Sequence, residues 1–278
     1  MKAVRTKAVV PAKITPIETA QGIFARDTNC CLGPKEIMAV YAGHNLELPA
    51  DLPPIPWSPA ELAAARARGE YLMLMPPGLT MQAICEKGNN LGPDGGKLLF
   101  DTDWYEKEEF FTKATTGDAW DWHLITRAVI PGSTGQNYVE QTARIRDYLT
   151  DVVHHDRDLP PVYQQAVAEF SEKEDTLTEL VVSDWQEADR QLSTFALNRL
   201  FRPTPAQTLA LWVAYLAVNR ERLFESLYHW TPVLSSGGGL VDVGGFDRDG
   251  ARVRDWSPRA RRDGLGVVFS RRARVESV

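Results

Sequence analysis

The sequence has few apolar runs, and none of them approaches the roughly 20 residues that a helix needs to cross a bilayer. The first residues are basic, but no apolar run of signal-peptide length follows them. We therefore expect neither a signal peptide nor a transmembrane segment, and no insertion into a membrane. This predicts a cytoplasmic protein by default and leaves surface display by another route open.

Cysteine is scarce as well, with three residues in a chain of 278. Cys30 and Cys31 are neighbours, and adjacent cysteines rarely bridge each other because the bond would be strained. Cys85 stands alone. A disulfide framework is therefore excluded, and buried or free thiols are expected.

The chain also lacks the common motifs of catalysis and metal binding. The glycines at 237–239 and 244–245 have no following Lys-Ser/Thr pair, so they do not predict a phosphate-binding loop. His154 and His155 are adjacent, which turns their side chains in different directions on a helix and disfavours a shared metal ion. The acidic run 101–109 lacks the spacing of a helix–loop–helix calcium site. We expect no catalytic residue, no metal and no cofactor.

The hydrophobic pattern changes period twice along the chain. Period-two and short apolar segments dominate up to residue 135, a period of 3.6 follows, and strands return after residue 230. Strands, a helical block and strands again predict an α+β fold rather than repeated βαβ units. Helices are predicted over 58–69, 80–87, 138–152, 160–182, 183–201 and 204–227, and strands over 36–41, 70–75, 97–100, 120–130, 240–243 and 265–270. Residues 7–10 form a short apolar run.

The stretch 245–264 has the most unusual composition. Sixteen of its twenty residues are Gly, Ala, Ser, Asp or Arg. Residues 240–278 contain nine Arg, no Lys and six acidic residues, so this end is positive although the whole chain carries −6. Acids alternate with the arginines, which argues against nucleic acid as a partner. A polar insert between two predicted strands indicates a surface displayed by a scaffold.

The ending resembles a known family in several short motifs. They are Gly239-Leu240-Val241-Asp242-Val243-Gly244, Phe246-Asp247, Trp256-Ser257-Pro258 and the closing Leu265-Gly266-Val267-Val268-Phe269-Ser270-Arg271. In these it is similar to the C-type-lectin-like variable proteins of diversity-generating retroelements, which share their ending with the formylglycine-generating-enzyme-like branch of that fold. The chain also resembles a group of proteins from candidate-phylum bacteria that have the same helical middle. Residues 97–105 and 120–130 resemble an early strand pair of the fold.

The resemblance implies a C-type-lectin-like C-terminal scaffold with a helical middle block. On this basis residues 1–96 form an N-terminal region and 97–278 the lectin-like domain, with a helical insert at about 136–228 and a variable region at about 240–272. The composition of 245–264 fits the codons that adenine mutagenesis produces from Asn. Formylglycine-generating enzymes use late cysteines, and this chain has none after Cys85, which argues against copper-dependent oxidation.

The function implied is binding of variable targets, with a protein or peptide as the expected partner. Arginine suits such a surface because its planar fork forms paired hydrogen bonds with carboxylates. Trp256 is expected to anchor the stretch, with contact to a partner as the alternative. An inward framework is expected from Val241, Val243, Phe246, Val253, Leu265, Val267 and Phe269. The ligand-binding residues are predicted to be Asp247, Arg248, Asp249, Arg252, Arg254, Asp255, Trp256, Arg259, Arg261, Arg262 and Asp263.

Two alternatives stay open at this point. The first is an enzyme of unknown reaction, which would need titratable groups gathered around Asp101, Asp103, His123 or the pair His154-His155. The second is a structural interaction protein whose charged C-terminal stretch is not diversified and is simply solvated. The oligomeric state is not predicted by either pattern or resemblance.

Overall fold

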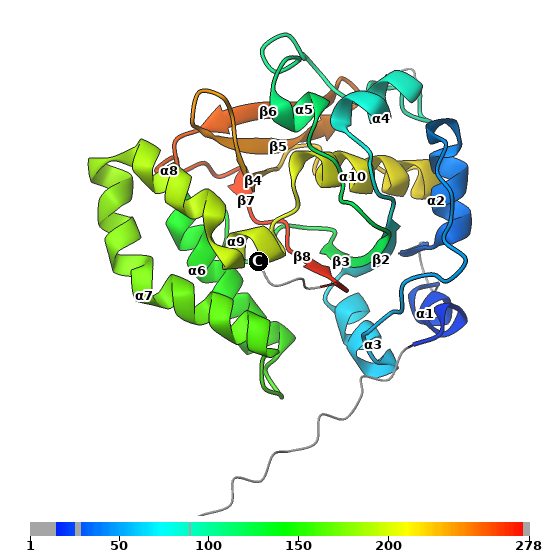
Figure 1. Cartoon of the computed structure of the whole chain (residues 1–278), viewed down its shortest axis with the longest axis horizontal. Coiled ribbons are helices and arrows are strands. Elements are labelled where there is room, and N and C mark those ends of the chain that lie inside the picture. Colours follow the sequence, from blue (N-terminus) through cyan, green and yellow to red (C-terminus); the bar gives the residue numbers. More distant parts are fainter. Residues whose placement is uncertain (1–14, 26–28, 89, 275–278) are drawn as a thin grey trace, which may run out of the picture.

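The computed structural model describes residues 15–25, 29–88 and 90–274. It shows an α+β fold with two four-stranded sheets, which confirms the predicted fold class at that level (Figure 1). The first sheet has the order β1-β2-β3-β8, and the second has the order β6-β5-β4-β7. The strands are β1 (Cys31–Leu32), β2 (Glu70–Met75), β3 (Asp121–Thr126), β4 (Tyr228–Leu234), β5 (Leu240–Asp247), β6 (Gly250–Trp256), β7 (Leu265–Gly266) and β8 (Ser270–Arg272). The short apolar run at 7–10 lies outside the described residues.

Helices fill most of the remaining chain, and none of those described is long and apolar enough to cross a membrane. Side chains cap several of them, as predicted: Ser58 and Thr204 accept hydrogen bonds from the backbone N–H groups of Glu61 and Gln207. The helices are α1 (Ile17–Phe24), α2 (Pro34–Val40), η1 (Ala42–His44), α3 (Pro59–Ala67), α4 (Met81–Lys87), α5 (Glu109–Thr112), α6 (Tyr138–Tyr148), η2 (Leu149–Val153), α7 (Pro161–Ser183), α8 (Trp185–Thr194), α9 (Ala196–Phe201) and α10 (Pro205–Asn219).

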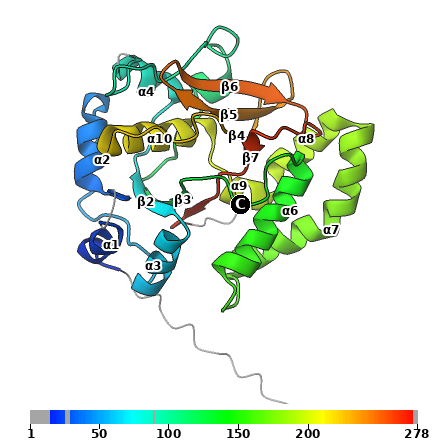
Figure 2. The same cartoon turned by 180° about the vertical axis from the view of Figure 1, so that it is seen from behind.

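Helix α10 lies between the two sheets, as both views show (Figures 1 and 2). It contacts β2 of the first sheet and β5 of the second, as well as α2 and α4. Every residue from Pro205 to Leu216 is buried, so this part of the helix is buried on all sides rather than along one stripe. It is therefore the central element of the larger hydrophobic cluster.

The second sheet separates two hydrophobic clusters. Val241 and Val243 of β5 belong to the cluster around α10, whereas Leu240 of the same strand belongs to a second cluster beneath α6–α9. Because successive side chains on a strand point to opposite faces, β5 is buried on both. All seven predicted framework residues are buried, and so are the residues between them on β5.

The predicted helical insert is divided between the two clusters. Helices α6–α9 pack on the second cluster and lie on the opposite side of the molecule from α1–α3 (Figures 1 and 2). Helix α10 belongs to the first cluster. It also ends at Asn219, earlier than the predicted 227, because Arg220 adopts a left-handed conformation.

Three other predictions from the sequence are wrong in detail. Residues 36–41 lie in and just after helix α2 rather than in a strand, because Pro34 starts a helix that buries Ile37 and Tyr41 four residues apart. The helix predicted over 183–201 starts with Asp184, not Ser183, as its capping residue. It breaks at Phe195, whose backbone is extended.

The predicted early strand pair is also wrong. Segment 97–100 is not a strand of either sheet; Leu99 forms an isolated parallel bridge with Ala251 of β6. Strand β3 instead pairs with β2 and β8 in the first sheet. The first sheet contains β1 and β2 from before residue 97 and β3 and β8 from after it. The domain boundary between residues 96 and 97 stays a prediction.

Candidate functional site

The polar stretch 245–264 is not the loop that its composition predicts, because half of it is regular structure. Strand β6 occupies Gly250–Trp256 and pairs antiparallel with β5 along its length. Only Arg248 and Asp249 lie between the two strands. Gly250 closes this turn with a φ of +104°, a conformation that side-chain-bearing residues rarely adopt. The polar side chains are therefore carried by a hairpin whose other residues are held in the core.

The tip of this hairpin is held by its own charges. Arg252 forms an ion pair with Asp247 at 2.8 Å and donates to the carbonyl of Gly245 at the same distance. Asp247 in turn accepts from the N–H of Asp249 at 2.9 Å. Burial raises the pKa of Asp247, but these hydrogen bonds outweigh it and hold the pKa below its usual value. Arg248 donates to the carbonyl of Asp94, so most charges at the tip already have partners.

The opposite end of the hairpin forms a pocket of about 300 Å³, here called the Asp242 pocket. Three predicted ligand-binding residues, Arg254, Trp256 and Arg262, line it. Asp242 stands directly opposite Arg254 in the register between β5 and β6. The remaining lining residues come from the segment before β4, from β4 itself and from the chain around β7: Ser226, Tyr228, Gly264 and Leu265.

Asp242 is the least expected member of this pocket. The residue is 1 % exposed, and its Oδ2 has no hydrogen-bond partner among the described residues. Desolvation raises the pKa of the carboxyl group to about 8, against an opposing attraction from Arg254 and with a further increase from Asp255. At neutral pH the group is therefore mostly protonated and can donate a hydrogen bond.

Each arginine of the pocket lies over an aromatic ring. The guanidinium carbon of Arg254 is 4.7 Å from the ring centre of Tyr228, and that of Arg262 is 4.7 Å from the ring centre of Trp256. Across residues 15–25, 29–88 and 90–274, neither guanidinium forms an ion pair or donates a hydrogen bond. Stacking thus orients both groups while leaving their donors available.

The other predicted site residues lie outside the pocket. Asp255 accepts a hydrogen bond from the Ser235 hydroxyl at 2.7 Å, and Arg261 forms an ion pair with Glu140 of α6 at 2.6 Å. Arg259 and Asp263 are exposed on the segment after β6. The structure therefore separates the predicted surface into a self-paired tip, a pocket and an exposed segment.

The sequence left two roles open for Trp256, as an anchor and as a contact for a partner. Its side chain is partly buried and packs against the second hydrophobic cluster, as expected of an anchor. It also lines the Asp242 pocket, where the guanidinium of Arg262 lies over its ring.

Asp242, Tyr228 and Ser226 were missed by reasoning from the sequence. Asp242 carried a signal, because an acidic residue between Val241 and Val243 interrupts an apolar strand that is buried on both faces. Tyr228 and Ser226 carried none, since they lie before the polar stretch and reach the pocket only through the pairing of β4 with β5 and β7.

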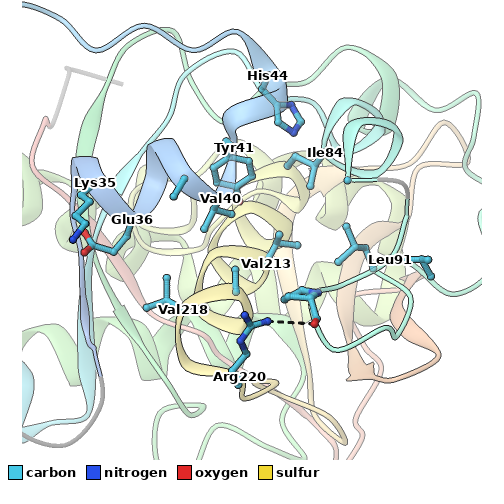
Figure 3. Close-up of a pocket in the computed structure, with 15 residues that line it drawn as sticks. Lys35, Glu36, Val40, Tyr41, His44, Ile84, Leu91, Val213, Val218 and Arg220 are labelled. Carbon is cyan, nitrogen blue, oxygen red and sulfur yellow. Dashed lines mark hydrogen bonds between the residues drawn. The ribbon is translucent and has the colours of Figure 1, made fainter.

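A larger cavity of about 540 Å³, here called the apolar groove, lies on another part of the surface (Figure 3). Its apolar side chains come from α2, α4, α10 and the segment 88–98, and include Val40, Ile84 and Val213. Arg220 donates to the carbonyl of Pro93 at one end. Nothing in the described residues indicates what would occupy this groove, and no predicted site residue lines it.

The groups named for an enzyme do not form a catalytic set. His123 Nδ1 lies 3.3 Å from Ser270 Oγ, a pair that the sequence did not reveal. Both residues are buried in the first sheet, where burial lowers the pKa of His123 to about 3. Asp121 is near in sequence, but its carboxylate accepts from the backbone N–H groups of Trp122 and Arg274 instead of orienting the imidazole.

The remaining groups are dispersed. Asp101 and Asp103 are both exposed, and the Asp103 N–H donates to Asp101. His154 is buried against Tyr163, whereas His155 is exposed. In the part of the chain that the structure describes, no group of three or more His, Cys, Asp or Glu could hold a metal ion.

Comparison with known proteins found no matching family, no matching curated protein and no matching solved structure.

Proposed function

We propose that this protein binds protein or peptide targets through a diversified C-terminal surface carried on a C-type-lectin-like scaffold. The observation that carries the proposal is the Asp242 pocket, which brings Arg254, Trp256 and Arg262 together around a buried acid without a partner. Such a pocket, with unpaired charged donors and an aromatic wall, is typical of a binding site rather than of a solvated surface.

The burial pattern supports diversification in particular. The framework residues of the hairpin are buried, while Arg248, Asp249, Arg254 and Arg259 are exposed. Replacing exposed residues on a rigid sheet usually changes the free energy of unfolding by less than about 0.5 kcal/mol. A scaffold of this kind therefore tolerates varied sequences at the surface while its shape is retained.

This tolerance can be measured with two libraries displayed on yeast. One library randomises Arg248, Asp249, Arg254 and Arg259, and the matched control randomises Val241, Val243, Val253 and Phe246. We expect most members of the first library to resist protease and most members of the second to be cleaved, because only the second disturbs the core. If both libraries lose protease resistance to the same extent, the proposal of a diversified surface is contradicted.

The genome offers an independent test. A neighbouring reverse transcriptase gene, together with a near-copy of the 3′ end of this gene that differs only at adenines, is the expected arrangement. If both are missing, the diversification proposal fails, whereas the proposal that the pocket binds a ligand is not tested by that result.

A further inference from the structure

We propose that the Asp242 pocket recognises a carboxylate group of the bound target, with Arg254 and Arg262 as its cationic donors and Asp242 as a neutral acid that donates a third hydrogen bond. This inference rests on the proposed binding function and names the chemical class that the site takes. The carboxylate comes from an acidic side chain or from the C-terminus of a peptide.

The charges of the lining residues favour an anion. Arg254 and Arg262 are the two basic side chains that face the pocket, and Asp242 is its single acid. Since Asp242 is protonated at neutral pH, the pocket carries two positive charges with no internal counter-ion. Neither guanidinium group has an ion-pair partner in the described residues, so both can form the paired hydrogen bonds with which arginine binds carboxylates.

The position of Asp242 explains why a ligand, rather than the protein, completes its hydrogen bonds. Trp230, Asp242 and Arg254 stand side by side on β4, β5 and β6, and therefore share one face of the second sheet. Asp242 Oδ2 and Trp230 Nε1 are buried and have no partner within the described chain. Asp242 also lines the pocket, so its buried carboxyl group is the one that a ligand oxygen in the pocket would satisfy.

An ammonium ligand is disfavoured by the same arrangement. The ring faces of Tyr228 and Trp256 would attract a cation, but guanidinium groups already cover both. An incoming ammonium group would also be repelled by the positive charges of Arg254 and Arg262, with Asp242 as the single acid of the pocket. A carboxylate meets no like charge as long as Asp242 keeps its proton.

Other charged groups near Asp242 do not reverse this balance. Tyr228 and Trp230 face it from β4, and Arg254 faces it from β6. Arg262 faces it from the segment after β6, and Asp255 of β6 acts on it from outside the pocket. Asp255 raises the pKa of Asp242, which keeps the acid neutral.

The test uses the full chain and three unlabelled peptides, and isothermal titration calorimetry measures the affinity of the protein for each peptide. The first peptide has blocked ends and contains four Glu residues, the second replaces Glu with Gln, and the third contains Gln with a free C-terminus. We expect the Glu peptide to bind at least tenfold more tightly than the blocked Gln peptide. If the third peptide binds more tightly than the Glu peptide, the bound carboxylate is that of a C-terminus rather than of an acidic side chain. Equal affinity for all three, or no binding, overturns the proposal.

Three single variants locate the binding. Arg254→Ala and Arg262→Ala are each expected to weaken the Glu peptide about tenfold, because each removes a charge-assisted donor. Arg259→Ala removes the same charge from the same segment outside the pocket, and we expect it to stay within twofold of the wild type. An equal loss in all three variants would show a diffuse electrostatic effect and would refute the pocket. Thermal unfolding confirms that each variant is folded.

The pH dependence separates a neutral acid from an ionised one. Between pH 7 and pH 9 the wild-type affinity for the Glu peptide is expected to fall about tenfold, because ionised Asp242 repels the ligand above its pKa of about 8. Asp242→Asn keeps a hydrogen-bond donor without a titrating proton, so its affinity should stay constant over this range. The same fall in Asp242→Asn would overturn the role of Asp242.

These results are distinguishable from failure of the proposed function. If the exposed positions tolerate randomisation but the pocket variants bind the Glu peptide as the wild type does, the carboxylate inference fails and the display function stands. If the pocket binds the Glu peptide but the genome has neither reverse transcriptase nor template, the diversification fails and the carboxylate site stands.

Discussion

Glu70 and Asp242 are two buried acids in equivalent places, and the protein treats them differently. Each is 1 % exposed and lies on an inner strand of a four-stranded sheet, Glu70 on β2 and Asp242 on β5. Glu70 is held by two arginines, with Arg68 Nε at 2.6 Å and Arg271 Nη2 at 2.8 Å. Asp242 has an oxygen with no partner among the described residues, and no ion pair.

The difference indicates separate roles for the two acids. A buried charge with well-placed partners joins the elements that supply them, here β2 and the last strand β8. A buried acid without partners costs free energy and keeps its proton, so its persistence needs another reason. We interpret Glu70 as structural and Asp242 as part of a binding site.

The largest effect that would test this comparison is expected for Glu70→Gln. The substitution leaves Arg271 charged in the core without its partner, which should lower the free energy of unfolding by about 3–5 kcal/mol. Urea unfolding at pH 7 measures the change. The control is Glu109→Gln, which breaks the exposed pair with Lys113 and should leave the urea midpoint unchanged. A stable Glu70→Gln variant would remove the structural role.

Asp242→Asn is expected to have the opposite sign. The folded-state pKa of Asp242 is raised above its unfolded value, so the stability that its proton contributes is complete below about pH 4 and is lost as the pH rises towards 8. The amide does not titrate. The variant should therefore match the wild type near pH 4 and exceed it by about 2–4 kcal/mol near pH 7.5.

Urea unfolding at several pH values measures this divergence. Asp249→Asn, which changes an exposed acid at the hairpin tip, serves as the control and should run parallel to the wild type. If Asp242→Asn is less stable than the wild type at pH 7.5, Asp242 is a structural acid like Glu70 and the comparison collapses.

The smallest effect is expected for Arg254→Gln. Arg254 attracts the ionised form of Asp242 across the strand pair, so its removal should raise the pKa of Asp242 further. A ¹³C NMR titration of the Asp242 carboxyl carbon measures the shift. Arg259→Gln removes an equal charge farther along the chain and should leave the titration unchanged; an equal shift would show that the attraction is not local.

Local signals predicted a large part of the fold. Ser58 and Thr204 started helices as expected because a capping box depends on four neighbouring residues. The strand over 70–75 was predicted with its correct bounds, because its apolar run is closed by neighbouring Gly and Pro residues. Segment 36–41 was wrongly predicted as a strand, because a run of six residues is too short to distinguish the period of a strand from that of a helix. The deciding feature was Pro34, which starts the helix before this segment.

The candidate site was predicted only in part. Exposed and buried positions of the hairpin followed from residue type, and Arg254, Trp256 and Arg262 were all among the predicted ligand-binding residues. Their separation from Asp247 and Arg252 was not predictable, because it depends on which residues pair across the turn. The sequence equally could not reveal that Arg261 is engaged by Glu140, which lies on α6.

The sequence alone determined the α+β class, the helix caps and the position of a charged, arginine-rich surface near the C-terminus. These depend on residues close together in the chain, whose spacing sets both propensity and face. Only the tertiary structure decided that β5 is buried on both faces and that Asp242 meets Arg254, Tyr228 and Arg262 in one pocket. The physical reason is that strand pairing joins residues far apart in the chain, and burial between two clusters, not residue type, keeps the proton on Asp242.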